Sequence, residues 1–62
     1  MKVNGYTIEP GADLRGANLA GMNLAGMNLA GANLAVAQFW NSVLTGADLS
    51  NADLHGANLE NA

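Results

Sequence analysis

Residues 11–62 read GADLR GANLA GMNLA GMNLA GANLA VAQFW NSVLT GADLS NADLH GANLE NA when they are divided into groups of five. The fourth residue of every complete group is leucine or phenylalanine, at Leu14, Leu19, Leu24, Leu29, Leu34, Phe39, Leu44, Leu49, Leu54 and Leu59. The second is mostly small, at Ala12, Ala17, Met22, Met27, Ala32, Ala37, Ser42, Ala47, Ala52 and Ala57. A period of five therefore holds without a break through this stretch.

Each group combines a short extended segment with a turn. The second and fourth residues are separated by one residue, usually Asn or Asp, so two apolar side chains point one way and a polar one points the other. The first residue of each group is Gly or Asn everywhere except at Val36. Gly and Asn enter the left-handed region of backbone space at the least cost. The pattern predicts a three-residue strand and a corner, repeated every five residues.

A helix is the competing interpretation, because Ala and Leu favour helices. A period of five does not match 3.6 residues per turn, so the leucines would be spread around the whole circumference. A glycine at nearly every fifth position opposes a helix by roughly 1 kcal/mol each relative to alanine. We therefore reject the helix and expect the chain to bury its two inward positions by winding around its own axis and stacking on itself.

Groups such as Gly16-Ala17-Asn18-Leu19-Ala20 and Gly56-Ala57-Asn58-Leu59-Glu60 resemble the repeats of pentapeptide-repeat proteins, and the resemblance covers residues 11–62. It implies an all-β fold, a right-handed quadrilateral β-helix with four pentapeptides per coil, so ten groups would make about two and a half coils. Residues twenty apart would then lie above one another. The inward columns would be Leu14-Leu34-Leu54, Leu19-Phe39-Leu59, Leu24-Leu44 and Leu29-Leu49.

Residues 1–10 do not repeat, and we expect them to form an N-terminal cap on the repeat domain of residues 11–62. Val3, Tyr6 and Ile8 can cover the first coil, and Pro10 fixes the direction of entry. No equivalent cap follows the last group, so Leu54 and Leu59 and the backbone of that coil are expected to form an uncapped end. A domain of about 60 residues is marginal in stability, so we expect a second chain to cover this end.

The outward positions contain one group of departures from the pattern. Val36, Trp40 and Val43 replace polar residues or glycine around one corner of the second coil, and Ala20 stacks beside Trp40. A tolerated irregular repeat is one explanation. An exposed tryptophan among apolar residues favours the other, a protein contact.

Met22 and Met27 occupy small-residue positions, either filling space near the N-terminal end or contacting a partner.

The composition excludes several kinds of chemistry. The formal charge is −3, with two basic and five acidic side chains and no Cys, so direct binding to nucleic acid, disulfides and cysteine metal sites are not expected. His55 is expected to be solvated, and Asp13, Asp48 and Asp53 take the Asn position of the repeat. We expect no catalytic site, cofactor, metal or small-molecule substrate. The first ten residues lack a signal peptide or membrane span, which favours a cytoplasmic protein, or a virion component if the source is viral.

These observations favour a non-enzymatic structural or protein-interaction module. It would assemble through its uncapped coil end and its Trp-containing patch, with a protein partner or as a homo-oligomer, for instance as a small subunit of a viral particle. The candidate interface residues are Ala20, Val36, Trp40, Val43, Leu54 and Leu59. The resemblance implies one alternative, a DNA mimic that binds gyrase, but that function needs a long rod with dense negative charge.

Overall fold

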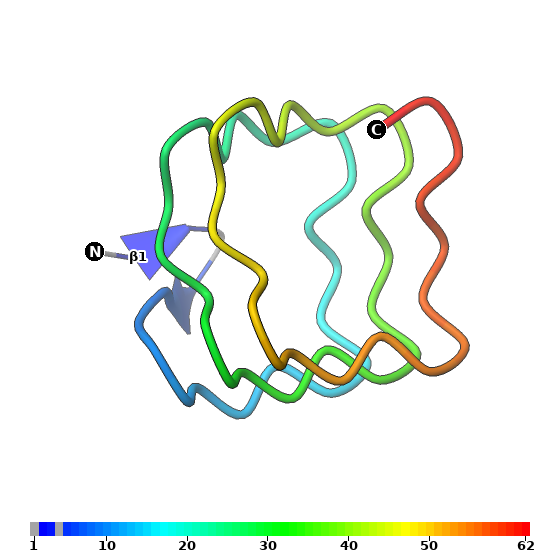
Figure 1. The fold of residues 1–62 in the computed structure, drawn as a ribbon. Coiled ribbons are helices and arrows are strands. Elements are labelled where there is room, and N and C mark those ends of the chain that lie inside the picture. The colour runs from blue at the N-terminus through cyan, green and yellow to red at the C-terminus, as the bar shows by residue number, and fades with distance from the viewer. Residues whose placement is uncertain (1, 4) are drawn as a thin grey trace.

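The repeating part of the chain stacks on itself in layers, as Figure 1 shows in a computed structural model that describes residues 2–3 and 5–62. Parallel β-bridges join residues twenty positions apart, and every bridged residue is the central residue of a group. The bridged pairs are Asp13 with Asn33, Asn18 with Gln38, Asn23 with Val43, Asn28 with Asp48, Asn33 with Asp53, and Gln38 with Asn58. The chain is therefore a β-helix whose repeat is twenty residues long.

Backbone hydrogen bonds hold each layer to the next at two points in every group. The Leu14 amide donates to the Asn33 carbonyl at 2.8 Å, and the Asn33 amide donates to the Ala12 carbonyl at 2.9 Å. At the turns the Gly16 amide donates to the Ala35 carbonyl at 2.9 Å. The later layer supplies the acceptor for the Leu14 and Gly16 amides and the donor for the Ala12 carbonyl, so one layer completes the hydrogen bonding of the layer before it.

The corner residues have the backbone conformation that the sequence predicts. Within 11–61, positive φ angles occur at the first position of every group, from 58° at Asn61 to 73° at Gly11 and Gly26. Each turn is closed by a backbone bond such as that from the Ala17 amide to the Leu14 carbonyl, 3.0 Å long. This confirms that Gly and Asn mark the corners. Val36, the exception in sequence, adopts the same conformation at φ 62°.

The core fills the interior of the first two layers. Its fully buried side chains come mainly from the fourth and second positions of the groups; the largest are Phe39, Leu19, Leu24, Leu29 and Leu34. Burial decreases toward the last layer, where Leu44, Leu49 and Leu54 are partly buried and Leu59 is 39% exposed. Ser42 is the buried polar side chain of this core, and its hydroxyl donates to the Phe39 carbonyl at 2.7 Å.

A small hairpin precedes the repeats. Strand β1 (Lys2–Val3) pairs antiparallel with β2 (Tyr6–Thr7), with Lys2 opposite Thr7 and Val3 opposite Tyr6. Ile8 is buried in the core, and Val3 and Tyr6 pack against it. Met1 and Asn4, which belong to the predicted cap, lie outside the described residues.

The two methionines of the repeats both occupy the second position of a group in the first layer. Met22 and Met27 are partly buried and pack against the hydrophobic core. This packing supports the space-filling interpretation of both residues.

In the described part of the chain, no helix is long and apolar enough to cross a membrane.

Candidate functional site

Three exposed apolar side chains, Val36, Trp40 and Val43, form what we call the apolar band. They are 44%, 45% and 45% exposed, whereas the neighbouring Phe39 is fully buried. Val36 lies on the turn at residues 35–36 and Trp40 on the next turn, at residues 40–41. Val43 lies on the segment that follows. The sequence analysis placed the three residues around a single corner. In the structure they extend over two turns, because one complete three-residue segment separates Val36 from Trp40.

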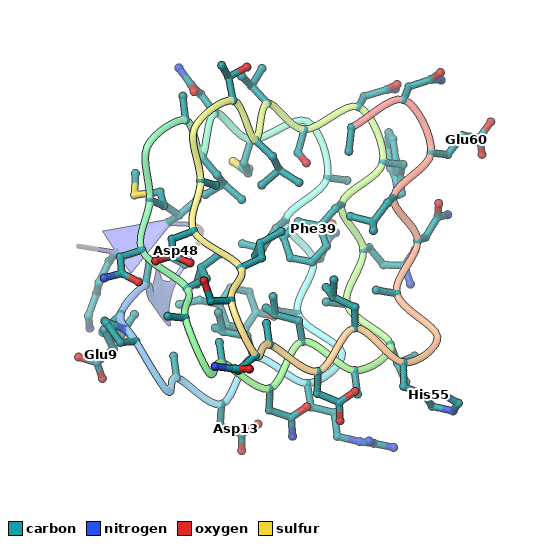
Figure 2. The ribbon with its side chains drawn as sticks, viewed as in Figure 1. Glu9, Asp13, Phe39, Asp48, His55 and Glu60 are labelled. Atoms are coloured by element: carbon teal, nitrogen blue, oxygen red, sulfur yellow. The ribbon has the colours of Figure 1, made fainter. Side chains whose placement is uncertain are left out.

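The apolar band has different neighbours in the layers before and after it. The Gly21 amide donates to the Trp40 carbonyl at 3.0 Å, which places the half-buried Ala20 next to Trp40 as predicted. On the other side the Asn41 amide donates to the Glu60 carbonyl at 2.9 Å. Glu60 therefore stands one layer above Trp40, and its side chain points outward in Figure 2.

The polar residue at the centre of each segment has a structural function that the sequence analysis did not identify. Its side-chain oxygen accepts a hydrogen bond from the backbone amide two residues later, in the manner of an Asx turn. The bonds join Asp13 to Arg15, Asn18 to Ala20, Asn23 to Ala25, Asn28 to Ala30, Asn33 to Ala35, Asp48 to Ser50, Asp53 to His55, and Asn58 to Glu60. The alternation of Asn and Asp with corner residues is the signal that could have revealed it.

This series is interrupted at the apolar band. Gln38 directs its side chain backward, and its Nε2 donates to the Val36 carbonyl at 3.1 Å. Val43 has no side-chain oxygen. Among the described residues, the amides of Trp40 and Thr45 accordingly lack the acceptor that the equivalent amides have. The exposed apolar side chains of the apolar band are therefore accompanied by two unpaired backbone amides, at Trp40 within the band and at Thr45 on the turn that follows it.

The side-chain bond at the centre of each segment is open to a direct test at Asn28. Asn28→Ala removes the 3.1 Å bond to the Ala30 amide and is expected to lower the free energy of unfolding by about 0.5–1.5 kcal/mol. Asn28→Asp keeps an oxygen in place, as Asp48 and Asp53 do, and should retain most of that stability. Urea unfolding followed by circular dichroism measures both variants. Equal losses in the two would show that the oxygen is not the stabilising group.

The edge of the last layer carries the second predicted contact region. Leu54 is partly buried and Leu59 is exposed there, so the two residues differ in accessibility. In the described chain the edge amides that would pair with a later layer have no backbone acceptor. These amides belong to Leu44, Gly46, Leu49, Asn51, Leu54, Gly56, Leu59 and Asn61. We call residues 42–62 the open edge.

Asp48 and Asp53 accept local hydrogen bonds close to the open edge. Asp48 accepts from both the amide and the hydroxyl of Ser50, and these hydrogen bonds lower the pKa of the Asp48 carboxyl. His55 donates its backbone amide to Asp53, and its ring projects outward in Figure 2. In the described ranges no three His, Cys, Asp or Glu side chains are grouped to hold a metal ion, and no pocket opens there.

Comparison with known proteins agrees with this geometry. The family model for pentapeptide repeats (8 copies) matches residues 11–39 and 32–62, which together include the whole stacked region. No curated protein and no solved structure matches the chain. Members of this family are generally non-catalytic structural or protein-interaction modules. From its repeats and its layered backbone, the chain belongs to the pentapeptide-repeat family.

Proposed function

We propose that this chain is a non-enzymatic protein-interaction module that assembles through its open edge and its apolar band. The observation that carries the proposal is the row of unpaired amides along the open edge, beside the exposed Leu59. Unpaired strand edges pair readily with other chains. The exposed Trp40 gives the module a second apolar contact region of the type found at protein interfaces.

The proposal includes a finer description of the fold. We infer a right-handed, four-sided β-helix of about two and a half coils, capped by residues 1–10. Four bridged segments within each twenty residues support the four sides. The buried Ile8 and the packing of Val3 and Tyr6 support the cap.

A second copy of this chain is the proposed occupant of the open edge. The edge turns a corner every five residues, so a straight strand can pair with only one of its segments. Another open edge turns at the same spacing and brings both donors and acceptors, the latter being the unpaired carbonyls of Ser42, Ala47, Ala52 and Ala57. Pairing two such edges would also cover Leu54 and Leu59, and apolar burial contributes roughly 25 cal/mol per Å².

Self-association of the 62-residue chain tests this proposal. Light scattering at micromolar concentration should give a mass of at least twice the 6.3 kDa of one chain. Leu59→Glu places a charge on the open edge and should give a folded monomer, as judged by an unchanged circular dichroism spectrum. Ala25→Glu, a matched change at an exposed position in the first layer, should leave the assembly intact.

The contradicting results are specific. A folded monomer for the unchanged chain at micromolar concentration would overturn assembly through the open edge. The same conclusion follows if Ala25→Glu and Leu59→Glu dissociate the assembly equally, because the effect would then come from charge alone.

A further inference from the structure

The turn at residues 40–41 has an unusual combination of groups. Trp40 on this turn and Val43 on the segment after it expose apolar surface, and the amides of Trp40 and of Thr45, on the next turn at residues 45–46, have no acceptor among the described residues. An exposed amide can be hydrated, but an apolar partner that covers it must supply an oxygen. A ligand for this surface therefore needs apolar groups and carbonyl oxygens together, which an extended polypeptide has.

The charge around the same turn is of one sign. The segments that meet there in successive layers are residues 17–24, 37–44 and 57–62, and their one charged side chain is Glu60. Glu60 stands beside Trp40 in the next layer. Arg15 does not belong to this group, because it lies on the preceding turn of its layer, where Arg15, Ala35 and His55 stand above one another in successive layers. A carboxylate beside an exposed indole, with no cation on these segments, is complementary to a cationic group.

We propose that Trp40, Val43 and Glu60 bind an extended segment of a partner protein in which an arginine stands next to an apolar residue. The guanidinium stacks on the Trp40 indole and pairs with the Glu60 carboxylate. The adjacent apolar side chain covers Val43. Carbonyl groups of the segment accept hydrogen bonds from the amides of Trp40 and Thr45. The proposal rests on the proposed interaction function and names the partner chemistry of the apolar band.

Arginine fits this surface better than other cationic or polar groups. Its planar guanidinium stacks on an aromatic face and keeps donors free for a carboxylate, whereas a lysine ammonium is a compact, strongly hydrated charge. A phosphate or an acidic peptide would be repelled by Glu60. The charge-dependent part of the binding should weaken with added salt, because the groups are exposed.

The single tryptophan of the chain makes the test direct, because tryptophan fluorescence reports on Trp40 alone. The probe is a blocked peptide of alternating leucine and arginine, titrated into a Leu59→Gln variant, which makes the open edge polar without adding a charge beside Glu60. The matched peptide carries citrulline, which has the shape of arginine without its charge. We expect saturable binding of the arginine peptide and about tenfold weaker binding of the citrulline peptide, equivalent to a difference of about 1.4 kcal/mol.

Two variants of the protein identify the groups involved. Glu60→Gln keeps the shape of the side chain. It should weaken binding of the arginine peptide about threefold to tenfold and have little effect on binding of the citrulline peptide. Val43→Asn supplies an oxygen for the Thr45 amide and removes apolar surface, so it should weaken the binding of both peptides. Equal binding of the two peptides, or an unchanged affinity in Glu60→Gln, would overturn the proposal.

The failures of the two proposals are distinguishable. Leu59→Gln removes the apolar contact of the open edge, adds no charge, and leaves Trp40, Val43 and Glu60 in place. If the unchanged chain proves monomeric and still binds the arginine peptide, assembly through the edge is wrong and the apolar band proposal stands. If the chain assembles and no peptide binds, the partner chemistry proposed for Trp40 is wrong.

Discussion

Replacing Phe39 by alanine is expected to leave the chain largely unfolded in dilute solution. Phe39 is fully buried in the middle layer, and such truncations cost about 3–5 kcal/mol. At roughly 0.05–0.15 kcal/mol per residue, a domain of this length has a total stability of about 3–9 kcal/mol. The loss is therefore comparable with the whole free energy of unfolding.

The column that contains Phe39 supplies its own controls. Leu19 lies below it and is fully buried, whereas Leu59 lies above it and is 39% exposed. Leu19→Ala is expected to cost about 2–5 kcal/mol, and Leu59→Ala in a monomer less than about 1 kcal/mol. Urea unfolding monitored by circular dichroism gives all three values. A Leu59→Ala loss in the monomer as large as that of Leu19→Ala would mean that the open edge is already packed.

The sequence predicts most of this architecture because one rule is repeated throughout the chain. The in, out, in alternation identifies the segments, and the Gly and Asn positions identify the corners, all of which have positive φ. Periodicity does not by itself give the number of segments per layer. The resemblance of the repeats supplied the expected twenty-residue offset, and the parallel bridges agree with it.

The parts that the sequence does not predict depend on local geometry. Strands β1 and β2 have two residues each, too few for a periodic pattern to appear. The turn bonds of the central Asn and Asp residues depend on the direction of a side chain. The spread of the apolar band over two turns could have been read from the sequence, because Val36 is the first and Trp40 the fifth residue of one group. The unpaired amides of Trp40 and Thr45 become visible only through the bonds that the other groups make.

Val36→Asn is expected to stabilise the folded chain by about 1–2 kcal/mol, because a left-handed conformation costs about that much for an ordinary L-residue. Val36 has φ 62°, and for a β-branched residue this conformation is a steric outlier. The equivalent corners at Asn41 and Asn51 have φ 59° without branching at Cβ. One valine methyl, Cγ2, lies 3.7 Å from where a Cβ on Gly56 would stand, so this methyl lies close to the Gly56 corner of the next layer.

The reciprocal change, Asn41→Val, isolates the backbone contribution from the loss of apolar surface. It puts a valine at the next corner in the same conformation and should destabilise the chain by a similar amount. For a domain of 60–100 residues, 1 kcal/mol corresponds to about 4–8 °C in Tm, so thermal unfolding resolves both changes. If Val36→Asn lowers Tm, the contact of the valine methyl with Gly56 outweighs the strain, and Val36 belongs to the folded structure more than to any interface.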